Sequence, residues 1–142
     1  MFMGEYNHTI DAKSRIIVPS RLREELGDRF VVTLGLEGCL FAYPYDEWNH
    51  FVEELRKLPG TQEARQLQRY FMAGAADCEA DKQGRILIPA KLREYAALEK
   101  DVVFIGMMNK VEIWSRERWE KNRTFEGMDE IADRMAEYGL SF

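Results

Sequence analysis

The sequence predicts an α+β fold in which two similar units share one core. The chain has 142 residues, 46% of them hydrophobic, which suits one shared core better than two independent domains. The stretch DAKSRIIVPSRLREEL at Asp11 recurs as DKQGRILIPAKLREYA at Asp81. Short β-type segments alternate with segments of helical spacing. We therefore expect a first unit of residues 1–60 and a second unit of residues 61–142, related by a pseudo-twofold axis.

The repeat extends beyond the basic stretch. After one inserted residue, Gly35 and Trp48 of the first unit find counterparts in Gly106 and Trp119 of the second. These ordered matches indicate an internal duplication. Two copies are too few for a solenoid, so the two units are expected to close one compact fold.

The first unit is expected to begin with a β-hairpin over about residues 5–18. EYNHTI alternates in polarity and RIIV is β-branched, with the turn-forming residues DAKS between them. Pro19 should end the second strand, and Ser20 should cap a short helix that stops at Gly27.

A second hairpin and a longer helix should complete this unit. FVVTL and CLFAY read as strands joined by a turn at Glu37–Gly38. Pro44 then fits the first turn of a helix that should end at Pro59–Gly60. Its apolar residues recur at helical spacing: Trp48, Phe51, Val52 and Leu55.

The second unit repeats this order. The expected elements are a helix at 61–72, strands at 75–80 and 85–88, a helix at 90–97, strands at 102–106 and 110–114, and a helix after Ser115. In the tail, Ile131, Met135 and Tyr138 have helical spacing. The tail should therefore form a marginal amphipathic helix that packs on a neighbouring subunit or holds a partner.

The charge distribution is uneven. A net charge of −5 argues against nucleic acid when taken alone. Yet the repeated stretches concentrate positive charge, each with a single aspartate against four basic residues: Lys13, Arg15, Arg21 and Arg23 in the first, and Lys82, Arg85, Lys91 and Arg93 in the second. Because salt screens charges over about 10 Å at 0.1 M, such local fields can bind phosphate despite distant acids.

Each basic stretch opens with the pattern D-x-x-x-R. The aspartate can accept backbone N–H groups and hold a tight turn, while the arginine offers a planar head suited to phosphate or guanine. In the simpler alternative, Asp11 only pairs with Arg15, and Asp81 with Arg85, to brace the turn. The basic neighbours are equally consistent with an ordinary solvated surface.

Taken together, these motifs resemble the MraZ family of bacterial regulators of the cell-division and cell-wall operon, built from tandem AbrB/SpoVT-type units. The resemblance spans the whole chain and is carried by MFMGEYNHTIDAKSR, RIIVPSRLRE, YPYDEW, QRYFMAGAADCEADKQGRILIP and the final pattern of Gly106, Asn109, Glu112, Ile113 and Trp114. It implies a double-split β-barrel, no catalysis, and sequence-specific binding of double-stranded DNA. It also implies a ring-shaped homo-oligomer acting at promoter direct repeats upstream of its own operon.

The resemblance also implies a set of site residues. The DNA-binding set is Lys13, Arg15, Arg21, Arg23, Lys82 and Arg85, with Gln83 in the second loop, and the turn-forming set is Asp11, Ser14, Asp81 and Gly84. Ser14 departs from the family, which usually has glycine there. If the position needs a positive φ, serine costs about 1 kcal/mol and could tilt Lys13 and Arg15 away. In a different turn, the Ser14 hydroxyl could instead contact phosphate.

Other classes of function find little support. Asp77, Glu79 and Asp81 alternate, as an exposed polar strand face does, and we expect no metal, cofactor or small-molecule substrate. His8 and His50 are isolated, and no catalytic motif is present.

The location and the alternative functions follow from the same features. Cys39 and Cys78 fit reduced core thiols, and no segment suggests export or a membrane span. A cytoplasmic, nucleoid-associated protein is expected. Two alternatives stay open: an AbrB-type antitoxin that binds DNA and a toxin, although such antitoxins usually carry one unit, and a ring-forming protein scaffold.

Overall fold

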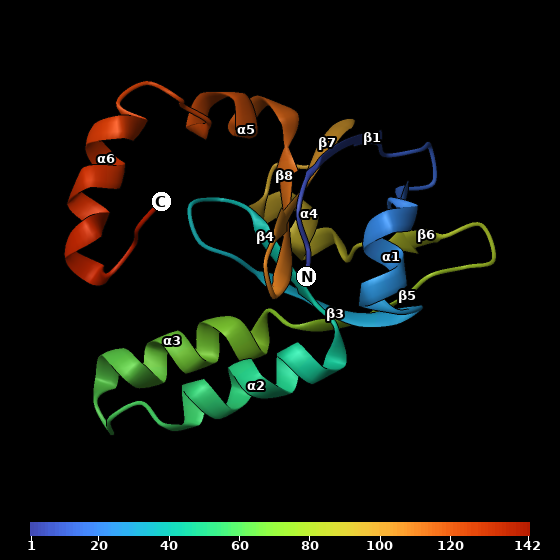
Figure 1. The fold of residues 1–142 in the computed structure, drawn as a ribbon. Coiled ribbons are helices and arrows are strands. Elements are labelled where there is room, and N and C mark those ends of the chain that lie inside the picture. The colour runs from blue at the N-terminus through green and yellow to red at the C-terminus, as the bar shows by residue number, and fades with distance from the viewer.

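The computed structural model describes residues 1–142 and has an α+β fold (Figure 1). Its elements are β1 (Glu5–Thr9), β2 (Arg15–Ile17), α1 (Ser20–Leu26), β3 (Arg29–Leu34), β4 (Leu40–Tyr43), α2 (Tyr45–Arg56), α3 (Gln62–Ala73), β5 (Ala76–Glu79), β6 (Arg85–Leu87), α4 (Ala90–Tyr95), β7 (Asp101–Met107), β8 (Lys110–Ser115), α5 (Arg116–Asn122), α6 (Met128–Met135) and a 3₁₀ helix (Ala136–Tyr138). The order of strands and helices matches the sequence prediction.

The predicted pairing of the first two strands is wrong. β1 and β2 are joined by a tight turn, as expected, but only one isolated bridge, Ile10 to Ile16, links their ends. β1 pairs instead with β7, and β2 with β6, both antiparallel. Alternating polarity predicts that a segment is a strand, but it does not say which strand lies beside it.

The two units exchange strands reciprocally. β1 of the first unit pairs with β7 of the second, and β5 of the second unit pairs with β3 of the first. The six-stranded sheet has the order β1-β7-β8-β4-β3-β5. β2 and β6 form a separate ribbon in which Ile16 lies opposite Ile86. Because Ile16 and Ile86 are corresponding residues of the two units, the pseudo-twofold axis passes between them.

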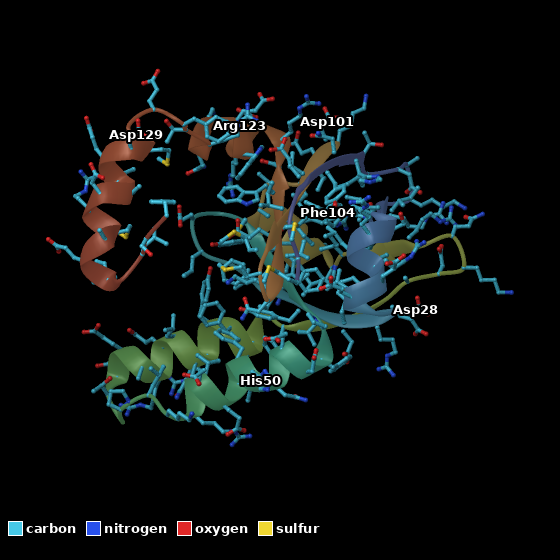
Figure 2. All side chains as sticks on the ribbon, viewed as in Figure 1. Asp28, His50, Asp101, Phe104, Arg123 and Asp129 are labelled. Atoms are coloured by element: carbon cyan, nitrogen blue, oxygen red, sulfur yellow. The ribbon has the colours of Figure 1, made fainter.

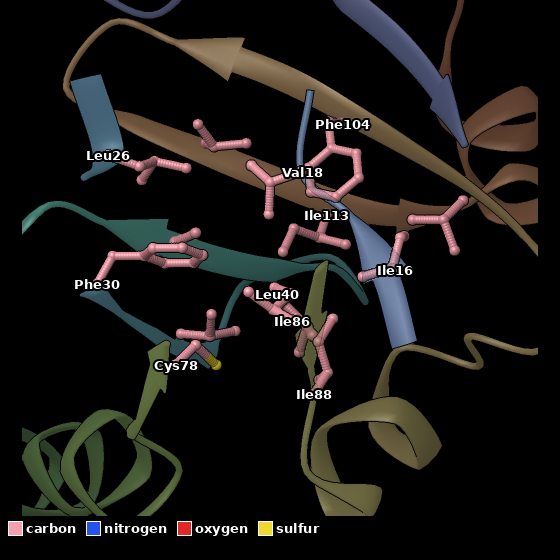
Figure 3. Close-up of a cluster of buried hydrophobic side chains, with 14 of the residues drawn as sticks. Ile16, Val18, Leu26, Phe30, Leu40, Cys78, Ile86, Ile88, Phe104 and Ile113 are labelled. Atoms are coloured by element: carbon pink, nitrogen blue, oxygen red, sulfur yellow. The ribbon is translucent and has the colours of Figure 1, made fainter. Parts of the chain in front are cut away.

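One hydrophobic cluster joins both units. It contains 19 buried residues, including Ile16 and Val18 from the first unit and Ile86 and Ile88 from the second, each 1% exposed (Figure 3). Phe104 of β7 lies in the same cluster. Because either unit alone would expose its half of this cluster, we expect the two to fold together.

The α2–α3 pair covers another part of the sheet. Trp48 and Leu55 of α2 and Phe71 of α3 are buried in a second cluster with strand residues. Thr33 of β3 is buried and donates its hydroxyl to the Phe71 carbonyl at 2.7 Å. The predicted amphipathic helix of the first unit is therefore confirmed.

Two helix ends test the capping predictions. Pro19, not Ser20, is the N-cap of α1, and no side chain caps that helix. The extended backbone of Pro19 lets Ser20 enter the first helical turn, so the Ser20 prediction is wrong. Gly27 ends α1 as expected, with φ of 82°.

The tail is helical but stands apart. α6 buries none of its residues, and in Figure 1 it lies away from the sheet. Figure 2 shows the same contrast in side chains, with Asp129 on the detached helix and Phe104 within the body. Every helix of this fold is too short or too polar to cross a membrane.

Candidate nucleic-acid interface

Two loops of equal backbone geometry carry the D-x-x-x-R patterns: the first loop, Asp11–Arg15, and the second loop, Asp81–Arg85. In the first, the Asp11 N–H donates to the Arg15 carbonyl at 2.8 Å and the Ser14 N–H donates to the Asp11 carbonyl at 3.0 Å. The same two bonds in the second loop measure 2.9 Å each. Both loops are therefore three-residue hairpin turns whose last residue is left-handed.

The aspartate side chain braces each turn. Asp11 Oδ1 accepts the backbone N–H groups of Lys13 and Arg15, both at 2.9 Å. Asp81 Oδ1 accepts those of Gln83 and Arg85 at the same distance. Each aspartate side chain therefore holds two backbone N–H groups of its own turn.

These hydrogen bonds favour the charged carboxylate. The Arg15 N–H is the main cause that lowers the pKa of Asp11 below its ordinary value, with smaller effects from the Lys13 N–H and the Arg15 guanidinium. The Arg85 N–H acts in the same way to lower the pKa of Asp81. The charged carboxylate that braces each loop therefore persists to a lower pH than that of an ordinary aspartate.

One N–H group of each loop arginine already donates a hydrogen bond within its own loop. Arg15 Nε donates to Asp11 Oδ2 at 2.9 Å, and Arg85 Nε donates to Asp81 Oδ2 at 2.8 Å. The bracing alternative is thus confirmed as a contact. The side chains are 30% and 26% exposed. Because a guanidinium has five N–H donors, the Nη groups stay available to a ligand.

Ser14 shares the left-handed backbone geometry of Gly84 in the second loop. Its φ is 63°, compared with 78° for Gly84, so the position does require the left-handed region. The Lys13 N–H and the Arg15 N–H nevertheless bond to Asp11 as their counterparts do in the second loop. Of the two possibilities left open for Ser14, the positive φ is therefore the one observed, and it leaves the backbone of Lys13 and Arg15 in the same arrangement as in the second loop.

The two basic loops lie on one side of the molecule. Lys13, Lys82 and Arg21 are exposed. The β1–β2 and β5–β6 loops both project from the side opposite α6, while the acidic α2 lies elsewhere (Figure 1). The fold therefore brings the two basic loops to the same side of the molecule, away from α2.

Arg23 makes a contact that the sequence did not reveal. This half-buried side chain of α1 lies against the second loop, across the pseudo-twofold axis. A Cβ placed on Gly84 would overlap Arg23 Nη1, so any side chain at this position would displace the Arg23 guanidinium. The Val18 N–H also donates to the Gly84 carbonyl at 2.9 Å. Strand exchange, which sequence periodicity cannot show, brings these residues together.

The remaining polar candidates do not gather. No group of three or more His, Cys, Asp or Glu side chains is placed to hold a metal ion, and Asp77 and Glu79 are exposed. Cys39 and Cys78 are free and buried. Burial raises the pKa of the Cys39 thiol to about 12 and that of Cys78 to about 11, so neither is a reactive thiolate near neutral pH.

Fold and loops together define a class: an internally duplicated α+β protein that presents the same aspartate-braced basic turn twice.

Comparison with known proteins identifies the family within this class. The family described as "MraZ protein, putative antitoxin-like" matches residues 1–70 and again residues 71–136, which confirms the repeat. The chain is 70% identical, over the full length of both proteins, to a Lachnoclostridium phytofermentans protein named transcriptional regulator MraZ. Proteins of the same name from Heliobacterium modesticaldum and Thermoanaerobacter pseudethanolicus are 56% and 54% identical, covering 99% of this chain and all of each relative. The chain belongs to the MraZ family.

Proposed function

We propose that this protein is a sequence-specific DNA-binding regulator of transcription, not an enzyme. The observation that carries the proposal is the pair of identically braced basic loops on one side of a duplicated fold. A rigid loop binds phosphate and base edges at low entropic cost, because little backbone freedom remains to be lost. The names of the relatives support the same reading.

The loop residues divide into two kinds of contact. Lys13 and the Nη groups of Arg15 are proposed to dock at a groove edge. In the second loop Arg85 takes the place of Arg15, and Lys82, which aligns with Ala12, supplies the basic group. Arg21, which is exposed at the start of α1, is placed to neutralise phosphate. Arg23 acts at this surface through its contact with Gly84.

We further propose that the molecule works as a ring-shaped homo-oligomer. Met128, Ile131 and Met135 of α6 form an apolar face that is 37–40% exposed and unpartnered within the chain. An amphipathic helix in water usually buries such a face, and a neighbouring subunit would cover it. A ring presents many loops at once, so effective concentration favours operators with several closely spaced direct repeats.

The finer assignments follow as part of the same proposal. The operator lies upstream of the protein's own division and cell-wall operon, and the protein resides in the cytoplasm on the nucleoid. The chain divides into AbrB/SpoVT-like units of residues 1–60 and 61–142. We also propose a double-split β-barrel. The six-stranded sheet is not closed, but side chains from this sheet and from the β2–β6 ribbon lie together in the 19-residue cluster, which supports the proposal.

Fluorescence-anisotropy titrations test the function. The parent chain, Lys13→Ala and Lys57→Ala are titrated with DNA from upstream of the gene and with a shuffled duplex, over a salt series. Lys57 is a matched control because its side chain is 72% exposed and follows α2, away from the loops. We expect tight binding to the upstream DNA and a defect only in Lys13→Ala. Loss of a phosphate contact should weaken both duplexes and lower the salt slope by about 1, whereas loss of a base contact should cost about 1–3 kcal/mol on the upstream DNA alone.

Equal, weak binding of both duplexes by the parent at near-physiological salt would refute the proposal. A ring-forming protein scaffold, which needs no DNA, would then be the better interpretation.

A further inference from the structure

The two loops have the same backbone but different side chains. Their hydrogen bonds agree within 0.1 Å, from the aspartate brace to the closing carbonyl. Between the shared Asp and Arg, the first loop has Ala-Lys-Ser and the second has Lys-Gln-Gly. The fold therefore presents different chemical groups at two positions that the pseudo-twofold axis relates to each other.

The surroundings of the loops differ as well. Gly84 leaves room for the Arg23 guanidinium, whose Cζ would be 2.7 Å from a Cβ at that position. Ser14 has a Cβ at the equivalent position, so the first loop leaves less room there. Arg93, the counterpart of Arg23, has a buried Nε without a hydrogen-bond partner. The asymmetry thus reaches beneath the loop tips.

The middle residues of the two loops differ in charge and in hydrogen-bonding groups. Lys13 and Gln83 are both exposed, and the backbone N–H of each is held by the loop aspartate at 2.9 Å. An ammonium group suits phosphate or the O6 and N7 acceptors of guanine. A carboxamide both donates and accepts, and pairs with N6 and N7 of adenine.

We propose that the two loops of one chain read different base pairs, with Gln83 as a specificity-determining residue of the second loop. A twofold reader with identical loops recognises a palindrome, because each half-site meets the same groups. This chain instead recognises a non-palindromic box, and such boxes repeat naturally in one direction along DNA. The inference rests on the DNA-binding function proposed above.

A selection from random duplexes tests this inference. The parent, Gln83→Lys, and a triple variant (Ala12→Lys, Lys13→Gln, Ser14→Gly) whose first loop copies the second are each incubated with a randomised duplex library, and the bound DNA is sequenced. Gly84 is kept in every variant, so the Arg23 contact is undisturbed. We expect the parent to enrich a non-palindromic box. Gln83→Lys should reduce the preference at one base position by about tenfold, and the triple variant should shift the enriched box toward a palindrome.

Several outcomes would overturn the inference. A palindromic box for the parent, or an unchanged base preference in Gln83→Lys, refutes it while leaving DNA binding intact. A parent that enriches no sequence refutes the proposed function and this inference with it. Circular dichroism of each variant excludes misfolding as the cause of a change.

Discussion

Replacing Ser14 with glycine should stabilise the protein, although the chain gains freedom when unfolded. Ser14 has a φ of 63°, and a left-handed conformation costs a residue other than glycine roughly 1–2 kcal/mol. Glycine removes that cost but adds about 0.4–1 kcal/mol of unfolded-chain entropy. No hydrogen bond of the fold uses the Ser14 hydroxyl; only its N–H donates, to Asp11. The expected net gain is about 0.5–1 kcal/mol, or roughly 2–4 °C in Tm.

Urea unfolding at fixed protein concentration measures this effect. Ser14→Gly should raise the denaturation midpoint without changing the m-value. Ala12→Gly is the matched control, since Ala12 lies in the same loop and has no positive φ. It should leave stability unchanged or lower it by up to about 1 kcal/mol.

The reverse change at the second loop extends the test. Gly84→Ala would have to adopt a φ of 78° and also displace Arg23, so it should lose more stability than Ser14→Gly gains. The reasoning is refuted if Ser14→Gly lowers the midpoint, or if Ala12→Gly raises it equally.

Three further predictions concern pH, thiol reactivity and assembly. Burial lowers the pKa of His8 below 6.5, so the unfolded chain takes up the proton first, and stability should fall as pH drops through that value. Urea midpoints at pH 8, 6.5 and 5 should show this slope, and His8→Asn should remove its share. At pH 8, a chromogenic disulfide should label Cys39 and Cys78 slowly in the folded protein and fully in guanidinium; rapid labelling of the folded chain would contradict their burial. Ile131→Glu should lower the mass measured by light scattering, whereas Asp133→Asn on the polar face of α6 should not; equal masses would argue against assembly through this helix.

Local features could be predicted from the sequence because their causes are local. The aspartate brace needs only residues two and four positions away, and it forms as expected at Asp11 and Asp81. The amphipathic spacing of Trp48 and Leu55 likewise fixes which face of α2 is buried. Even the left-handed φ of Ser14 was foreseeable from the glycine at the equivalent place in the second loop.

Partners distant in the chain could not be predicted in the same way. The alternation of EYNHTI suits a strand paired with β2 as well as one paired with β7, and only the shared core decides between them. The Arg23–Gly84 contact depends on that decision, since it crosses from one unit to the other. The sequence therefore predicts Arg23 only as a surface base, and its contact with the second loop becomes visible only in the structure.

Fusion of the two units in one chain allows their loops to differ in sequence. A homodimer of single units would present two identical loops, because each subunit carries the same sequence. In the fused chain, residues on the axis must still match: Ile16 faces Ile86, and a change in either would leave a gap in the core. Exposed loop residues do not pack in the core, so Lys13 and Gln83 can differ without disturbing core packing. Fusion thus keeps the symmetry that the core needs and removes the symmetry that would restrict recognition to palindromes.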